Sequence, residues 1–216
     1  MNTPAIAVFC SGAGTNLQAI LNACARGAIP ARVALVISDR ANAYALTRAR
    51  RAGAPAVSLD PATFPAHAGF ERELIARCRA ARVRLVCLAG FMRILSPVFV
   101  RAFRHRILNI HPALLPAFPG AHAVRDALAW GVKVTGVTVH LVDEQVDHGP
   151  IVLQEPVLVR PGDTEASLLA RLHRVEHRLY PRAIRLVLAG QVAVRGRRTV
   201  IHRSAAKRTG EVPGTF

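Results

Sequence analysis

The chain has 216 residues, of which 51% are hydrophobic and 19% are charged, and its formal net charge is +16. That hydrophobic content is ample for a sizeable core and excludes a disordered or fibrous protein. No apolar run approaches the roughly 20 residues of a membrane span, and the N-terminus lacks the basic segment of a signal peptide. We therefore expect a cytoplasmic protein with one compact domain, residues 1–203, and a basic tail, 204–216.

The positive charge indicates an anionic partner, either nucleic acid or a phosphorylated small molecule. Nearly all basic residues are arginines spread along the chain, and only Lys133 and Lys207 are lysines. The densest basic segment, near the C-terminus, has no interleaved aromatic residues and no recognisable DNA- or RNA-binding motif. We therefore favour a small anionic molecule over nucleic acid.

Apolar residues recur with strand and helix periodicity in turn along the chain, which predicts an α/β fold. We expect a mainly parallel, twisted sheet with helices on both faces. The expected strands, in chain order, are 5–10, 32–38, 55–60, 84–91, 105–111, 134–142, 150–159, 191–196 and 198–202. The expected helices are 15–27, 43–53, 70–82, one starting at Ser96 and Pro97, 123–131, and a long one after Asp163 or Thr164. Strands 134–142 and 150–159 are expected to pair antiparallel, and the last two strands to form a hairpin.

The segment "CSGAGTNLQAI" forms a glycine-rich turn between the first strand and the first helix. Gly12 and Gly14 let the backbone turn tightly, and the helix N-terminus presents free N–H groups to an anion. The third glycine of a dinucleotide fingerprint is replaced by Leu17, so a phosphate monoester fits better than a pyrophosphate. A tight turn without a ligand is the alternative. A dehydrogenase would also need an acidic residue after the second strand, where Asp39 is the candidate.

In "LNIHPALLP", Asn109 and His111 lie two residues apart on a predicted strand, so their side chains share one face. The prolines that follow make the next loop stiff. An amide donor beside an imidazole suits stabilisation of an oxyanion, where one donor contributes roughly 2.7–4 kcal/mol. Alternatively, both side chains satisfy loop carbonyls.

The segment "HLVDEQVDHGPI" places His140, Asp143, Glu144, Asp147 and His148 in a turn between two strands. A carboxylate near His111 would raise the pKa of its imidazole above the usual value of about 6.5. Asp147 is the preferred partner because the glycine that follows His148 permits a sharp turn. The other two acidic residues either line the site or are solvated.

We predict no metal site. Four cysteines lie in apolar segments without CxxC spacing, as expected for reduced, buried thiols. His173 and His177 are four residues apart on the long predicted helix, but "HRVEH" lacks the HExxH order and a third ligand.

Five segments, "SGAGTNLQAI", "LAGFMRILSP", "LNIHPALLPAFPGAHA", "GVTVHLVDEQVDHGPI" and "EHRLYP", together resemble the folate-dependent glycinamide ribonucleotide formyltransferases of purine biosynthesis. The resemblance runs in order from about Ile6 to Arg203. It implies a Rossmann-like formyltransferase fold whose N-terminal half binds the ribonucleotide phosphate, with folate binding and catalysis in the C-terminal half. It also implies 10-formyltetrahydrofolate as co-substrate, no permanently bound cofactor or metal, small-molecule partners, and a monomer or homodimer.

The resemblance also implies a set of site residues. The catalytic trio is Asn109, His111 and Asp147, with the last raising the pKa of His111. The positions matching the ribonucleotide site are Gly14, Thr15, Asn16, His173, Arg174 and Glu176. Those matching the folate site are Met92, Arg93, Ile94, Leu95, Asn109, Asp143, Glu144, Asp147 and, more weakly, His67. Three positions depart from the family pattern: Ala113 replaces a frequent Ser, His148 a common Gly, and His67 a frequent Arg.

Two alternatives stay open, the deformylase and a nucleic-acid-binding protein, and a third enzyme of the same fold is disfavoured. Methionyl-tRNA formyltransferases share the fold but carry a further domain of about 100 residues, for which this chain has no room. Formyltetrahydrofolate deformylase, a hydrolase, uses the same trio but usually has an additional N-terminal regulatory domain. A basic nucleic-acid-binding protein would explain the charge but not the Asn–His–Asp set.

Overall fold

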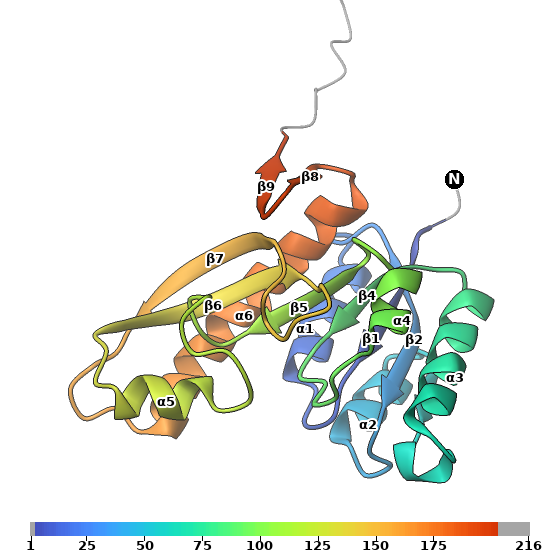
Figure 1. The fold of residues 1–216 in the computed structure, drawn as a ribbon, viewed down its shortest axis with the longest axis horizontal. Helices are drawn as coiled ribbons and strands as arrows, with labels where there is room; N and C mark the ends of the chain where they lie inside the picture. The colour runs from blue at the N-terminus through green and yellow to red at the C-terminus, as the bar shows by residue number, and fades with distance from the viewer. Residues whose placement is uncertain (1–2, 203–216) are drawn as a thin grey trace, which may run out of the picture.

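The computed structural model describes residues 3–202, so the predicted basic tail, 204–216, lies outside the described residues. The central feature is a seven-stranded sheet of order β3-β2-β1-β4-β5-β6-β7, and a separate hairpin pairs β8 with β9 (Figure 1). The strands are β1 (Ala5–Phe9), β2 (Arg32–Ser38), β3 (Ala56–Ser58), β4 (Val83–Leu88), β5 (Ile107–His111), β6 (Val134–Leu141), β7 (Ile151–Leu158), β8 (Val192–Arg195) and β9 (Arg198–Ile201). The helices are α1 (Thr15–Ala25), α2 (Tyr44–Arg51), α3 (His67–Ala80), α4 (Pro97–Ala102), α5 (Ala123–Ala129) and α6 (Glu165–Leu188), with a short 3-10 helix η1 (Pro61–Thr63).

Strands β1 to β5 pair in parallel, and β6 runs antiparallel to both β5 and β7. The mainly parallel sheet, the antiparallel β6–β7 pair and the terminal β8–β9 hairpin are therefore confirmed. The β5–β6 register sets Asn109 directly opposite His140. This pairing brings two polar residues into contact, two positions along the strands from the His111–Thr138 pair.

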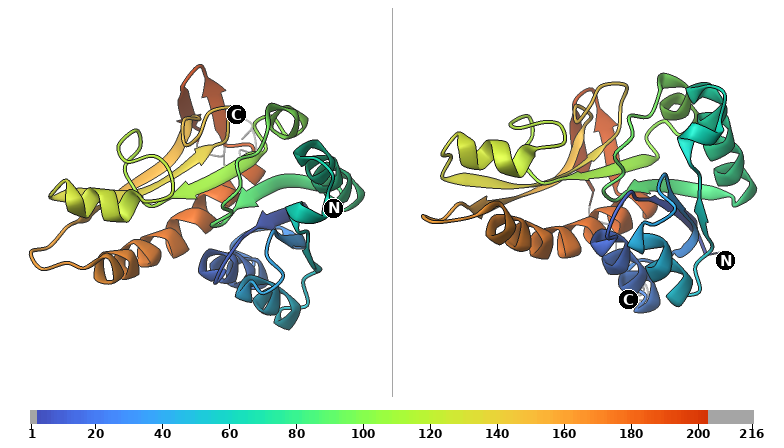
Figure 2. Two further views of the ribbon diagram at one scale, coloured as in Figure 1. Left: turned by 60° about the horizontal axis from the view of Figure 1, so that its bottom comes forward. Right: turned by 90° about the horizontal axis from the view of Figure 1, so that it is seen from below.

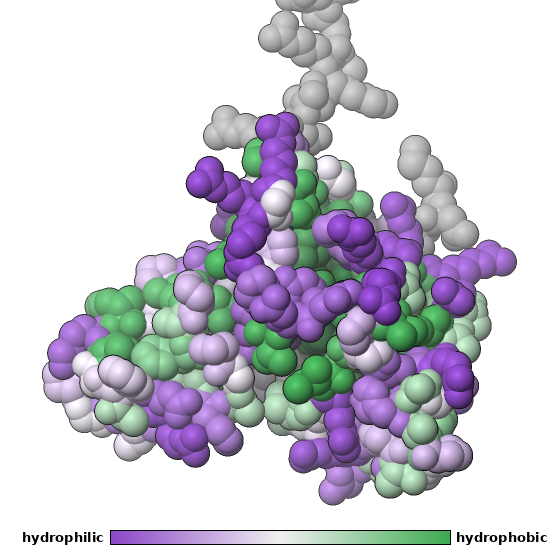
Figure 3. All heavy atoms as spheres, in the orientation of Figure 1, coloured by the Kyte–Doolittle hydropathy of each residue, from purple (hydrophilic) through white to green (hydrophobic). Residues whose placement is uncertain are grey.

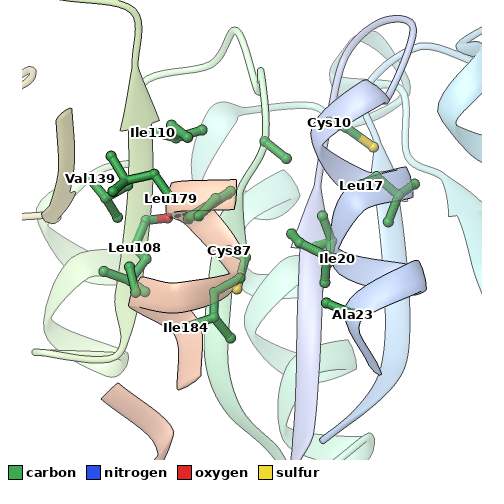
Figure 4. Close-up of a cluster of buried hydrophobic side chains, with 14 of the residues drawn as sticks. Cys10, Leu17, Ile20, Ala23, Cys87, Leu108, Ile110, Val139, Leu179 and Ile184 are labelled. Atoms are coloured by element: carbon green, nitrogen blue, oxygen red, sulfur yellow. Dashed lines mark hydrogen bonds between the residues drawn. The ribbon is translucent and has the colours of Figure 1, made fainter. Parts of the chain in front are cut away.

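Both faces of the sheet are covered, which is why β1 is buried at every position. Ile6 and Val8 point into a core shared with α1 and α6, whereas Ala7 and Phe9 point into a second core with α3 and α4. Figure 2 shows α1, α2 and α6 on one side of the sheet and α3 and α4 on the other. In Figure 4 the first core joins side chains of α1 and α6 to those of β4, β5 and β6.

Most helix boundaries follow the predicted caps. Ser96 caps α4 with Pro97 at the first helical position, and Thr164 caps α6. The exception is α3, which begins at His67 rather than at Phe70. Its first turn carries no apolar periodicity, so the sequence pattern misses it.

The outer surface carries most of the charge. Figure 3 shows hydrophilic side chains across the middle of the face in view and on the β8–β9 hairpin at its top. None of the helices formed by residues 3–202 has the length and apolar character required to cross a membrane.

Candidate active site

A cavity of about 570 Å³ opens at the carboxyl ends of β1, β4 and β5. The strand order reverses between β1 and β4, and such switch points are where open α/β sheets bind ligands. The lining comes from the loop after β1, the loop after β4, the end of β5 and the loop after it, β6 and the loop after it, and α6. The lining segments are 12–16, 88–95, 109–112, 120–121 and 142–147. The single lining residues are His140 on β6 and Leu169, His173 and Glu176 on α6.

The predicted trio converges on one wall of this cavity. The Asp147 carboxylate accepts a hydrogen bond from Asn109 Nδ2 at 3.2 Å and lies 3.4 Å from His111 Nδ1. Its second anchor is the backbone N–H of Gly120, which donates to Oδ2 at 2.8 Å. One carboxylate therefore joins the end of β5, the proline-rich loop and the loop after β6.

His140, which the sequence places in the turn without a role, lies on β6 and belongs to this cluster. Its Nδ1–H donates to the Leu141 carbonyl at 3.0 Å, so in the neutral ring Nε2 is an acceptor. Asn109 Nδ2 lies 3.1 Å from that Nε2 and donates to it. The two N–H groups of Asn109 thus face His140 and Asp147, which fixes the amide orientation.

His111 is 4% exposed, and its Nε2–H donates to the Phe118 carbonyl at 2.8 Å. Burial lowers the pKa of His111 below its ordinary value of 6.5, and the nearby Asp147 and Phe118 raise it without compensating fully. The expected effect of Asp147 is therefore present, but the expected net rise in the His111 pKa is wrong. The reason is that desolvation of the imidazolium outweighs one carboxylate and one carbonyl.

The pKa of Asp147 is lowered from its ordinary value. Burial raises the pKa of this carboxyl, but His140, the Gly120 N–H and His111 together outweigh burial. Asp147 also has φ of 51°, a left-handed conformation that costs energy for a residue with a side chain. The side chain is held in place by its contacts on both sides, so the site residue is ionised and fixed.

The other end of the cavity is built from the loop after β1. Gly14 is the N-cap of α1, has φ of 71°, and leaves the helix N-terminus without a side-chain cap. A Cβ at this position would lie 2.6 Å from the Ala45 Cβ, so only glycine allows the close approach of α2. The N–H groups of the first turn of α1 thus have no side-chain cap, which is the arrangement that the predicted anion site requires.

Glu176 lies beside this anion site and is 4% exposed. Asn16 Nδ2 donates to its Oε2 at 2.8 Å, and His173 Nε2 lies 3.9 Å from the same oxygen. Burial raises the pKa of the Glu176 carboxyl, while Asn16 and His173 lower it. The carboxyl group lines the cavity, where it can accept hydrogen bonds from a polar ligand.

The loop after β4 forms a mainly apolar wall. Met92 and Ile94 are 59% and 71% exposed at its rim. Arg93 Nε donates to the buried Asp39 carboxylate at 3.0 Å. Asp39 is the acidic residue that a dehydrogenase would need to bind a ribose, and here it is paired with Arg93 instead. Opposite them, Glu144 pairs with the exposed Arg101 at 3.2 Å.

Two predicted positions are not brought to this cavity. His67 lies at the start of α3 with its ring against Phe70, at 6.2 Å between ring centroids. Arg174 lies on the exposed side of α6. Neither residue lines the cavity, whereas Thr15, Leu95, Asp143 and the remaining predicted positions do.

No group of three or more His, Cys, Asp or Glu side chains within residues 3–202 is arranged to hold a metal ion. His173 and His177 stack on each other with ring centroids 6.0 Å apart. All four cysteines are free; three are buried, and Cys24 is partly exposed. Burial raises the pKa of Cys10 to about 12, so that thiol stays protonated.

Residues 5–184 match the formyl transferase family. The chain is 45% identical over 179 residues to phosphoribosylglycinamide formyltransferase of Escherichia coli (strain K12), covering 83% of this chain and 84% of that protein. It is 46% identical over 187 residues to the trifunctional purine biosynthetic protein adenosine-3 of Drosophila pseudoobscura pseudoobscura, covering 86% of this chain. The chain spans only 14% of the length of that larger relative.

Solved structures agree with these relatives. The structure of glycinamide ribonucleotide transformylase 1 from Symbiobacterium toebii superimposes with a TM-score of 0.91 at 55% identity, covering 92% of this chain and 94% of that one. A formyltetrahydrofolate deformylase from Pseudomonas syringae pv. tomato is more distant, with a TM-score of 0.86 at 27% identity. The match covers 94% of this chain and 67% of the deformylase.

Proposed function

The chain belongs to the formyl transferase family, and we propose that it transfers the formyl group of 10-formyltetrahydrofolate to the amine of glycinamide ribonucleotide in purine biosynthesis. The observation that carries the proposal is one continuous cavity with an anion site at one end and an apolar wall at the other. The polar trio lies between them. The anion site suits the ribonucleotide phosphate, and the apolar wall suits the flat ring system of the folate.

In the proposed binding mode, the N–H groups of the first turn of α1 hold the phosphate, and Glu176 accepts hydrogen bonds from the ribose. The N-terminal half of the chain thus supplies the phosphate site, and the C-terminal half supplies most of the folate and catalytic residues. The pterin lies against Met92, Ile94 and Leu95, with the loop after β6 on its other side. This arrangement directs the substrate amine toward the formyl carbon near His111.

In the proposed reaction, the amine nitrogen attacks the formyl carbon and a tetrahedral oxyanion forms. Asn109 and protonated His111 stabilise that oxygen, and the ionised Asp147 favours the imidazolium. The bond between the carbon and the folate nitrogen then breaks, and the proton lost by the amine passes to that nitrogen, directly or through water. The formyl group ends on the ribonucleotide, and tetrahydrofolate leaves.

Two contacts must be exchanged for this reaction. His111 Nε2–H donates to Phe118, and Asn109 donates to His140 and Asp147. A substrate oxygen therefore replaces the Phe118 carbonyl at His111 and one of the two acceptors at Asn109. Before the substrate binds, the donors of His111 and Asn109 have acceptors within the protein, and afterwards they have the substrate oxygen. Neither donor is therefore buried without a partner.

The proposal extends to the setting of the enzyme. We infer a cytoplasmic monomer or homodimer that acts on small molecules rather than on nucleic acid. It uses 10-formyltetrahydrofolate as a co-substrate and requires no metal.

The test is a spectroscopic assay of folate deformylation with the purified protein, in the presence and absence of glycinamide ribonucleotide. We expect deformylation that requires the ribonucleotide and is lost in His111→Ala. The matched control is His202→Ala, because His202 is exposed and lies outside the cavity. Deformylation without the ribonucleotide would indicate a hydrolase related to the deformylase, and activity in His111→Ala equal to the control would contradict the assigned role.

A further inference from the structure

The β8–β9 hairpin contacts the loop that carries Asp147. Arg197, in the turn of the hairpin, donates from Nη2 to the His148 carbonyl at 2.8 Å. Its Nη1 lies 2.5 Å from Nε2 of the same histidine. The other ring nitrogen of His148 contacts Asp143 Oδ2 at 2.7 Å. A chain of contacts therefore runs from the hairpin, through the residue after Asp147, to the start of the loop.

We propose that Arg197 and His148 are positioning residues that hold the Asp147 loop in its catalytic geometry, so that the C-terminal hairpin takes part in formyl transfer without touching the substrates. This inference rests on the proposed function. Neither residue lines the large cavity, so any effect of either on catalysis passes through the loop.

The imidazole of His148 lies between a carboxylate and a guanidinium. The Asp143 carboxylate is an acceptor, so Nδ1 of His148 carries the proton and donates to it. Arg197 Nη1 lies 2.5 Å from Nε2 and 3.1 Å from Nδ1, so the guanidinium contacts the imidazole ring as a whole. The planar fork of arginine lets it bind the ring and the backbone carbonyl at once, which a lysine ammonium does less well.

The loop needs such support because of its backbone. Asp147 has φ of 51°, and strained residues persist only where the surroundings determine them. On its other side, Gly149 packs so closely on β6 that a Cβ would lie 1.8 Å from the Leu141 carbonyl oxygen. His148 is thus the residue between the strained position and the anchored glycine, and Arg197 fixes its carbonyl.

Charged and titratable side chains lie close to both the His148 and the His111 imidazole. Asp143 and Arg197 face His148 directly, and the small cavity behind the loop also brings Arg101, Arg104, His105 and Glu144 close to it. Asp147 and His140 face His111. Because Asp147 raises the pKa of His111, loosening the loop is expected to lower that pKa.

The experiment compares Arg197→Ala with Arg198→Ala, in which the neighbouring, exposed arginine of the same hairpin is removed. The first readout is the imidazole titration of His111 followed by NMR without substrates, which does not depend on the proposed activity. The second is kcat for formyl transfer as a function of pH. In Arg197→Ala we expect the His111 pKa to fall by about half to one unit and kcat above that pKa to fall roughly three- to tenfold. The KM values are expected to change less than twofold.

Arg197→Lys keeps the charge and the aliphatic stem, and it replaces Arg197→Ala if the alanine variant unfolds. We expect a smaller shift in the same direction. If the His111 titration in folded Arg197 variants matches that of Arg198→Ala, the inference is overturned, whatever the activity. If the titration shifts but the wild-type protein shows no transfer, the positioning role stands and the proposed function fails.

Discussion

Replacing Asp147 with asparagine separates the electrostatic role of this side chain from its shape. Asparagine keeps an acceptor for the Gly120 N–H but removes the negative charge 3.4 Å from His111 Nδ1. Since the Asp147 carboxylate raises the pKa of His111, the variant is expected to lower it further. The imidazolium is the form that stabilises an oxyanion. As the pH is raised, the rate of the variant should therefore begin to fall at a lower pH than the rate of the wild-type protein.

The magnitude follows from the distance. Two unit charges 3.4 Å apart interact by about 1 to 5 kcal/mol for an effective dielectric constant between 80 and 20. The side chains of His111 and Asp147 are only 5% and 10% exposed, so solvent screens the pair weakly. Because opposite charges within a few ångströms usually shift a pKa by about one to three units, we expect a shift of that size. At a pH well above the His111 pKa, this shift corresponds to a roughly 10- to 1000-fold lower rate.

The assay is single-turnover formyl transfer as a function of pH, together with NMR titration of the His111 ring. The control is Glu144→Gln, which removes a negative charge from the same loop, where Glu144 pairs with Arg101 rather than with His111. We expect the control to leave the His111 titration in place. An Asp147→Asn variant with an unchanged titration and an unchanged pH profile would refute the electrostatic role.

Side chains at the anion site and in the core give further expected outcomes. Glu176→Gln should raise the KM for the ribonucleotide roughly tenfold and leave the folate KM unchanged, because hydrogen bonds to a charged group are lost. Steady-state kinetics with each substrate varied in turn measures both constants, and equal changes in the two KM values would contradict this prediction. Gly14→Ala should destabilise the protein by roughly 1–3 kcal/mol in urea unfolding, because its Cβ would lie within 2.6 Å of a side-chain carbon of α2. Gly27→Ala shares the positive φ but has nothing within 4 Å, so it should cost less. Tyr180→Phe should lower the free energy of unfolding by roughly 1–3 kcal/mol, since the single buried O–H shared by the Leu88 and Leu108 carbonyls is lost, whereas the exposed Tyr44→Phe should change it by less than about 0.5 kcal/mol.

The sequence predicts the sheet and its helices well because strands buried on both faces and amphipathic helices have different apolar periods. It also predicts which loops carry the site, because glycines and prolines interrupt those periods at 12–14 and 112–119. It does not predict the role of His140. That role depends on the β5–β6 register, which sets His140 opposite Asn109, and a shift of one residue would turn the side chain to the other face.

The net pKa of His111 is a second quantity that residue identity does not determine. A neighbouring carboxylate and burial act in opposite directions, and their balance depends on how much of the imidazole is removed from water. The positions of Arg197 and of the β8–β9 hairpin likewise depend on the tertiary structure. Nothing in the spacing of 191–202 relative to 143–149 indicates that the two segments touch.

One face of α6 links the two ends of the cavity. Glu176 and Tyr180 are four residues apart, so they project from the same side of the helix. Glu176 reaches the anion site through Asn16, while the Tyr180 hydroxyl contacts the carbonyls of Leu88 and Leu108 at 2.8 and 2.9 Å. Leu88 is the last residue of β4, and Leu108 precedes Asn109 and His111 at the end of β5. The helix that contributes to the proposed ribonucleotide site therefore also contacts the strand ends from which the proposed folate wall and the trio begin, so the proposed distance between the two substrates depends on α6.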